Sequence, residues 1–289
     1  PLTGRSPLKV RLSPLIVEPA SSRIFATTGG GHIYYSDDFG LTWTQASTPT
    51  SRLEGDRWAG IRDISSNGSI LVAAVSLETE LSPSPNPIDH YYSMDNGTTW
   101  QAQSISGMTG WEPLVKMSLT SNGNVFIMSQ QSSLFSKTWR STNGQAWTEV
   151  QNKFFTFVRC SGNLFVGIHL DSGYPVQTVT FYYSTDGITW SAGDTFQIDH
   201  ENAGMSIRGF EYGNGVFCLL LEINDIFGEP SGTYKTYTTS DGNTITENPV
   251  FDLGTVAQYV SRLSFTGNKF YFSLLEDVSV YSSASGESF

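Results

Sequence analysis

The chain has 289 residues, with 27 acidic against 16 basic ones, and a formal net charge of −11. That acidic balance argues against a general binder of nucleic acid or anionic membranes, and no apolar run reaches the roughly eighteen residues of a membrane span. Only two cysteines occur, Cys160 and Cys218, so we expect buried free thiols, with a disulfide between neighbouring repeat units as the alternative.

A short turn phrase recurs six times along the chain, usually after an aromatic-rich stretch. In chain order the copies cover 36–43, 93–100, 141–147, 184–190, 239–245 and 283–289. The first two read Ser-Asp-Asp-Phe-Gly-Leu-Thr-Trp and Ser-Met-Asp-Asn-Gly-Thr-Thr-Trp, the next two are one residue shorter, and the last two lack the tryptophan. A repeat of about fifty residues with one turn phrase per unit is typical of a β-propeller or array.

Each phrase predicts the turn of a β-hairpin. Its Asp or Asn side chain folds back onto backbone N–H groups, and its glycine takes the positive φ that the turn requires. The side chains expected in this role are Asp38, Asp95, Asn143, Asp186 and Asp241. We therefore assign these five residues to structure rather than to catalysis.

Two further strands are expected between successive turn phrases. The first strands of the units are predicted near 61–65, 114–120, 155–160, 206–212 and 259–265, and the second strands near 69–77, 124–130, 163–170, 216–223 and 269–275. A third strand enters each turn phrase and a fourth leaves it. The pattern predicts an all-β fold, a six-bladed β-propeller of four-stranded antiparallel blades, with no helix.

We expect the whole chain, 1–289, to form this single domain. The predicted blades are 12–48, 59–105, 113–151, 154–193, 205–249 and 258–289. Because the chain ends where the last blade needs a fourth strand, the segment 1–12, and 7–12 in particular, is expected to supply that strand. Such closure removes an exposed sheet edge that invites aggregation.

The turn phrase resembles the Asp-box, or BNR, repeat (Ser/Thr-x-Asp-x-Gly-x-Thr-Trp) of the sialidase-like superfamily. The resemblance covers nearly the whole chain, and it implies the propeller fold. It leaves function open, because Asp-box propellers include sialidases, other glycosidases, lectins, sorting receptors and virion proteins. Segments such as 212–217, which lead towards such a box, are similar in style to the repeats of bacteriophage virion or tail proteins and of bacterial surface propellers.

The long connections between blades are expected on the rim opposite the turn phrases, which we take as the binding face. These connections cover 44–59, 77–90, 101–113, 169–179, 191–205, 222–236 and 246–258. Aromatic side chains beside polar ones there resemble a sugar-binding surface, and the candidates are Trp58, Trp111, Tyr174, Asp199, His200 and Glu201. The alternative is that the aromatic residues only pack the loops onto the rim.

Nearly every predicted first strand carries one basic residue at a similar place. The set is Arg62, Lys116, Arg159, Arg208 and Arg262, with Arg11 as a further member. One interpretation is a positive ring that binds a carboxylate, sulfate or phosphate. The other, which we favour, is pairing with local acids, for instance Arg62 with Asp63 and Arg208 with Glu211.

An enzymatic function has weaker support in the sequence. Sialidases hold the substrate carboxylate with three arginines, and Arg208 and Arg262 match the second and third in position, but the Arg-Ile-Pro phrase of the first is absent. A glycosidase needs two placed carboxyl groups, for which Asp63, Asp199 and Glu201 are the candidates. The four histidines show no metal-ligand spacing, and we expect neither a metal nor another cofactor.

The sequence thus predicts a non-catalytic attachment module, extracellular or on a virion surface such as a tail fiber. It would bind a glycan or a partner protein, such as a host surface receptor or another virion protein, through the long-loop rim. It would not bind nucleic acid or insert into a membrane, and an oligomer is compatible with it. The alternatives are a sialidase-like glycoside hydrolase and a purely structural virion or scaffold propeller.

Overall fold

The structure is a computed structural model, which describes the chain in several stretches. These are residues 10–11, 23–28, 32–49, 60–76, 90–105, 116–131, 136–171, 176–199, 205–224, 230–253, 263–266, 268–273 and 280–287. All regular elements in these stretches are β-strands, so the described part contains no helix that is long and apolar enough to cross a membrane. The chain divides into two compact units, residues 1–116 and 117–289, and each is described by itself.

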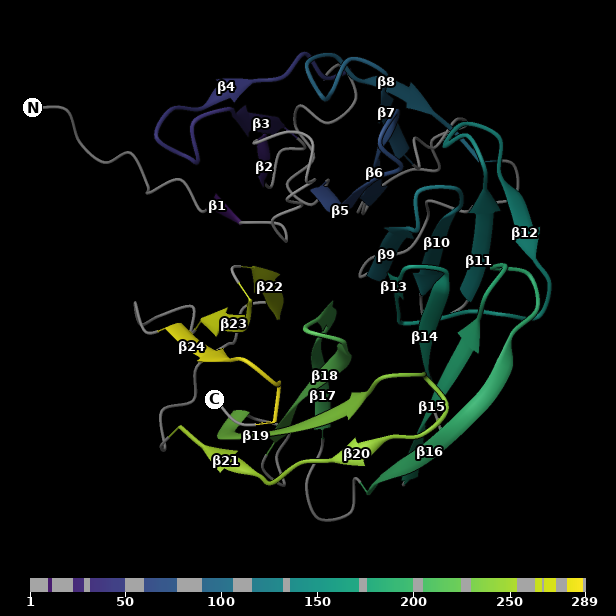
Figure 1. Cartoon of the computed structure of the whole chain (residues 1–289), viewed down its shortest axis with the longest axis vertical. Coiled ribbons are helices and arrows are strands. Elements are labelled where there is room, and N and C mark those ends of the chain that lie inside the picture. Colours follow the sequence, from purple (N-terminus) through teal and green to yellow (C-terminus); the bar gives the residue numbers. More distant parts are fainter. Residues whose placement is uncertain are drawn as a thin grey trace, which may run out of the picture. The chain divides into compact units, whose positions relative to one another are not determined.

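Unit 1 contains two four-stranded antiparallel sheets with strands in chain order (Figure 1). The first sheet consists of β1 (Val10–Arg11), β2 (Ile24–Thr28), β3 (Ile33–Ser36) and β4 (Thr44–Gln45). The second consists of β5 (Gly60–Ser66), β6 (Leu71–Ser76), β7 (His90–Ser93) and β8 (Gln101–Gln103). Sheets made only of neighbouring antiparallel strands need nothing longer than hairpin connections within a sheet.

Unit 2 contains four more sheets (Figure 1). The third sheet of the chain consists of β9 (Lys116–Ser121), β10 (Phe126–Gln131), β11 (Ser136–Ser141) and β12 (Thr148–Val150). The fourth consists of β13 (Phe157–Ser161), β14 (Leu164–Leu170), β15 (Val176–Ser184) and β16 (Ser191–Asp199).

The last two sheets depart from four strands. The fifth consists of β17 (Met205–Gly213), β18 (Val216–Asn224), β19 (Pro230–Thr239), β20 (Thr246–Glu247) and β21 (Phe251–Asp252), where β20 and β21 both pair with β19. The sixth has three strands among the described residues, namely β22 (Ser264–Thr266), β23 (Lys269–Ser273) and β24 (Val280–Ser283). The predicted fold class, an all-β propeller of six antiparallel blades, is confirmed.

The N-terminal segment pairs differently from our expectation. Val10 lies opposite Thr28 and Arg11 opposite Thr27, so β1 is the first strand of the first sheet. The first blade therefore obtains its own first strand from residues that we had expected to complete the last blade. The rest of segment 1–12 lies outside the described residues.

Two boundaries were predicted incorrectly. The predicted connection 191–205 is largely strand, because β16 continues to Asp199 and buries Ile198 while Thr195 and Gln197 stay exposed. The strand predicted at 155–160 begins later, at Phe157. Before it, Phe155 bonds through both its N–H and its carbonyl to the Ser129 hydroxyl of the third sheet, at 2.9 and 2.7 Å.

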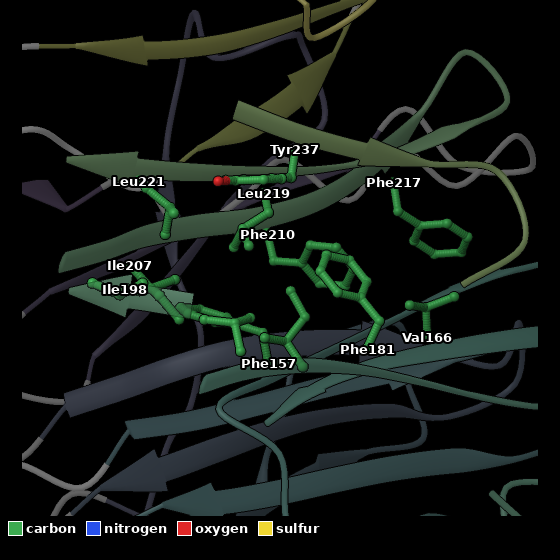
Figure 2. Packing of buried hydrophobic residues seen from close by; sticks show 12 residues of the cluster. Phe157, Val166, Phe181, Ile198, Ile207, Phe210, Phe217, Leu219, Leu221 and Tyr237 are labelled. Atoms are coloured by element: carbon green, nitrogen blue, oxygen red, sulfur yellow. The ribbon is translucent and has the colours of Figure 1, made fainter. Parts of the chain in front are cut away.

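Apolar side chains fill the space between neighbouring sheets within each unit. In unit 1, Phe25 of the first sheet and Ile64 and Tyr91 of the second belong to one buried cluster. In unit 2, the fourth and fifth sheets enclose the large cluster of Figure 2, in which Phe181 of β15 meets Phe210 of β17 edge to face at 6.1 Å. This burial supplies most of the driving force for packing the sheets against one another.

The two cysteines are free thiols, as predicted. Cys218 is fully buried, whereas Cys160 is partly buried and its Sγ lies 2.9 Å from the Ser121 carbonyl oxygen. Burial raises the pKa of both thiols, so both stay protonated and unreactive at neutral pH.

Candidate functional site

The turn phrases are held by side-chain oxygens that bond within their own turn. In the second phrase, Asp95 Oδ1 accepts from the Thr99 N–H and the Ser93 hydroxyl, both at 2.8 Å, and Oδ2 accepts from the Thr99 hydroxyl at 2.6 Å. Asp38 makes the same set with Thr42 and Ser36 in the first phrase. The side-chain and backbone hydrogen bonds from Thr42 lower the pKa of Asp38 to about 2.

The shorter turns, with one residue fewer, are also held by a side-chain oxygen that accepts hydrogen bonds within the turn. Asn143, Asp186 and Asp241 each accept two backbone N–H groups, from the residues two and three positions later. Asn143 does this with an amide oxygen, so a negative charge is not required for the turn. The five side chains that we assigned to structure are thus engaged within their own turns.

Most of the turn glycines pack against the preceding sheet of the same unit. A Cβ added at Gly187 would lie 2.6 Å from Ile127 Cδ1, and one at Gly286 would lie 2.8 Å from Cys218 Sγ. Gly97 approaches Phe25 in unit 1, and Gly242 approaches Val166, in the same way. Because Ile127, Val166, Cys218 and Phe25 all lie on second strands, each of these turns docks at an equivalent position of the preceding blade.

Polar side chains fix the same contacts between blades. Arg23, before β2, bonds Asp37 in its own blade and the Asn96 carbonyl of the next turn, at 2.7 and 2.8 Å. Arg140 Nε donates to the Asp186 carbonyl at 3.0 Å, and Asn214 Nδ2 donates to the Ala284 carbonyl at 2.7 Å. The turn phrases therefore act as joints between blades within each unit.

Arg159 joins the first strands of three successive sheets. Its Nη1 donates to Ser118 Oγ on β9 at 2.8 Å, and its Nη2 lies 2.7 Å from Glu211 Oε1 on β17. The side chains of Arg159 and Glu211 are only 9% and 11% exposed, so water screens the pair weakly. The guanidinium is therefore occupied by protein groups rather than available to a ligand.

Arg208 pairs with Glu222 of β18, not with Glu211 as we predicted. Its Nε lies 2.7 Å from Glu222 Oε2, while Oε1 of the same carboxylate accepts the Tyr234 hydroxyl at 2.8 Å. Glu211 is paired with Arg159 instead. The fully buried Glu222 lies opposite Ser206 in the β17–β18 ladder, and Arg208 is at the bulge between Ile207 and Gly209. Burial and the hydrogen bond to Glu222 raise the pKa of Tyr234, so its hydroxyl keeps its proton at neutral pH.

The sequence analysis missed Glu222 and Tyr234. The available signal was a single charged residue near the end of the apolar run 216–223, since a buried carboxylate needs a partner. It also missed the apolar tips of the first two turns, where Phe39, Leu41 and Met94 are 80%, 85% and 66% exposed.

Most of the candidate binding residues lie outside the described residues. This applies to Trp58, Trp111, Tyr174, His200, Glu201 and Arg262. Asp199 is described through its backbone, at the end of β16. Arg62 lies on β5 in unit 1 and is partly buried there. The proposal that the rim residues form a sugar-binding surface therefore stays a prediction.

The described residues contain no set of three or more His, Cys, Asp or Glu side chains placed to hold a metal ion. A tyrosine and a glutamate do meet, at Tyr234 and Glu222, next to Arg208. That tyrosine is 1% exposed and its hydroxyl donates to the carboxylate, so it does not present a nucleophile to a substrate.

No protein-family model matches the sequence, and no curated protein matches it significantly. Solved structures do resemble it. YCF48 bound to D1 peptide shares 12% identity over 99% of this chain and 84% of that chain, with a TM-score of 0.56. SapL1 lectin in complex with alpha methyl fucoside shares 12% identity over 90% of this chain and 87% of that chain, with a TM-score of 0.54.

A third structure is the alpha-L-arabinanase of Penicillium chrysogenum complexed with arabinobiose. It shares 15% identity over 75% of each chain, with a TM-score of 0.51. At these identities the likeness shows the fold alone, which agrees with the six sheets. The assignment of the turn phrases to the Asp-box family stays a prediction.

Proposed function

We propose that this chain is a non-catalytic binding module that recognises a glycan or a partner protein through its long connections. The observation that carries the proposal is the pairing of the first-strand arginines. Arg159 is held by Glu211, and Arg208 by Glu222, so neither guanidinium offers itself as the carboxylate clamp of a sialidase-like enzyme. Because these arginines are not available to a ligand, we assign recognition to the loops.

Two of the structures that share the fold carry a bound ligand that fits such a role. YCF48 is bound to D1 peptide, and SapL1 lectin is in complex with alpha methyl fucoside. A rigid antiparallel scaffold that presents variable loops suits either ligand class, because the scaffold folds independently of the loop sequences. As part of the same proposal, we place the module outside the cell or on a virion surface, where the style of its repeats is common.

The test begins with binding of the whole chain to a glycan array. We expect binding to at least one glycan class, and loss of at least tenfold in affinity when Trp58 and Trp111 are both replaced by alanine, since stacking on an aromatic face is lost. The matched control is Trp147→Ala, which removes a tryptophan from a turn phrase. Unchanged binding in the double variant would contradict the role of these two residues.

A chain that binds no glycan is tested next for a protein ligand, by immobilising it and passing over a panel of purified candidate receptors. If the chain binds neither a glycan nor a protein, the result favours the purely structural alternative and overturns the proposed function.

A further inference from the structure

The outermost strand of the fourth sheet has an unusually long edge. β16 has nine residues, whereas the corresponding strands β4, β8, β12 and β20 have two or three. The neighbouring strand β19 is also long, but its outer side is divided between β20 and β21. β16 can be followed in Figure 1 as the long strand after β15.

The register shows which backbone groups of β16 point to its free edge. Asp171 N–H donates to the Thr178 carbonyl, so the backbone groups of Thr178 face β14, and those of Val179 face β16 by alternation. Val179 lies opposite Phe196, which therefore faces β15. The backbone N–H and C=O groups of Thr195, Gln197 and Asp199 consequently point away from the sheet.

One part of this edge is already covered. The fifth turn phrase packs on it at Gly193, where an added Cβ would lie 2.8 Å from Asn243 Cα, and the Asp194 N–H donates to the Asn243 carbonyl at 2.8 Å. The covered part ends there. Among the described residues, no backbone partner is found for the N–H groups of Thr195 and Gln197, and both residues are exposed.

The uncovered part is held firmly from its inner face. The Phe196 ring stacks on Tyr237 of β19, with ring centroids 3.9 Å apart and planes 7° apart. Ile198 is 1% exposed within the cluster of Figure 2. An edge fixed in an extended conformation loses little entropy when another strand pairs with it.

We propose that the edge of β16 from Thr195 to Asp199 binds an extended segment of a partner protein as an added β-strand. A row of outward N–H and C=O groups is complementary to another extended polypeptide, and this mode of recognition takes its affinity from main-chain hydrogen bonds. Residues 195–199 contain neither proline nor lysine, the residues that commonly protect such an edge.

The negative charge of the chain indicates which kind of partner segment binds to the edge. The formal net charge is −11, and Asp194 is exposed at one end of the uncovered part, with Asp199 at the other end. A segment with lysine or arginine next to its extended core is therefore favoured. A second copy of the chain is disfavoured, because it carries the same net charge of −11. The edge includes Asp199, one of the loop candidates, but the glycan test of the proposed function depends on Trp58 and Trp111, so either proposal can fail without the other.

The experiment uses the whole chain and a synthetic peptide that carries the β15 sequence Val176–Phe181 between two lysines. Amide exchange is followed by NMR. At saturation we expect exchange at Thr195 and Gln197 to slow by about tenfold or more, as hydrogen bonds form. Gln197→Pro removes one outward N–H and should weaken binding about tenfold, whereas Gln197→Ala keeps it and should change affinity by less than about twofold.

Equal binding by the two variants, protection confined to other residues, or no binding at any soluble peptide concentration would overturn the proposal. If Gln197→Pro does not fold, Gln197→Lys replaces it, and we expect it to weaken binding of the lysine-flanked peptide in a salt-dependent manner. Sedimentation of the chain without peptide tests whether a second copy of the chain occupies the edge. A dimer that Gln197→Pro dissociates would also overturn the proposal.

Discussion

Arg159 on β13 and Glu211 on β17 form a 2.7 Å ion pair that connects the first strands of two neighbouring sheets. Arg159 also donates to Ser118 on β9, so one guanidinium ties three sheets of unit 2 together. A charge used in this way is part of the scaffold. At Arg159 the basic residue of the first strand is therefore paired within the protein rather than forming a free anion site.

Removing one partner of this ion pair should lower the free energy of unfolding strongly, whereas replacing both partners should lower it much less. We expect Arg159→Met to destabilise the fold by about 3 kcal/mol, because Glu211 would keep a nearly buried charge without its partner. The double variant Arg159→Met/Glu211→Leu should recover most of that loss. Urea denaturation of the two single variants and the double variant measures the coupling. Additive effects would show that the two side chains act independently.

A substitution at Gly187 tests the contact between a turn phrase and the preceding blade. This residue has a φ of 71°, and an added Cβ would lie 2.6 Å from Ile127 Cδ1. Gly187→Ala should therefore cost about 1 kcal/mol for the backbone and roughly 1–3 kcal/mol more for the clash. The matched control is Gly123→Ala, where φ is 91° and nothing lies within 4 Å of the added Cβ.

A second variant tests whether the clash with Ile127 Cδ1 causes the loss of stability in Gly187→Ala. Ile127→Val deletes Cδ1, so the loss caused by Gly187→Ala should be smaller in an Ile127→Val background, as measured by thermal or urea unfolding. Equal losses at Gly187 and Gly123 would mean that the turn does not dock on the preceding blade as described.

The turn aspartates predict a dependence of stability on pH. Hydrogen bonds from Thr42 lower the pKa of Asp38 from its ordinary 3.8 to about 2. A lowered folded-state pKa means that the carboxylate stabilises the fold fully above the unfolded pKa and loses this effect as the pH falls through the folded one. The stability difference between the natural chain and Asp38→Asn should therefore shrink between pH 5 and pH 2.

Asn143 supplies the reciprocal control, because its amide already makes the turn without a charge. Asn143→Asp should add a pH-dependent contribution over the same window, measured by thermal melts at several pH values. A stability difference that stays constant with pH in both variants would contradict the assignment of these side chains.

The fold followed from the sequence because its signals are local. Gly97, Gly187 and the other turn glycines take the positive φ that the phrase predicted, and the second strands, such as β14 (Leu164–Leu170), match their predicted ranges closely. The partner of Arg208 did not follow, because pairing across strands depends on register. Glu211 is nearer in sequence, yet the bulge between Ile207 and Gly209 and the β17–β18 ladder bring Glu222 to Arg208.

The length of β16 was missed for a similar reason. Its alternation of Thr195, Phe196, Gln197 and Ile198 is a strand pattern, but it follows a turn phrase whose other copies lead into short strands. The proposed ligand-binding residues lie in loops, whose conformation is not fixed by a repeating pattern. The blades and the contacts between them are therefore easier to predict from the sequence than the proposed binding face.

Incubation of the purified chain with a fluorogenic sialoside tests the central claim most directly, with Glu222→Gln as the matched variant. Because Tyr234 and Glu222 are buried and hydrogen-bonded to each other, we predict no release of the fluorophore above the level of that variant. Sustained turnover by the natural chain that Glu222→Gln abolishes would contradict the account, since it would make the buried pair a catalytic one.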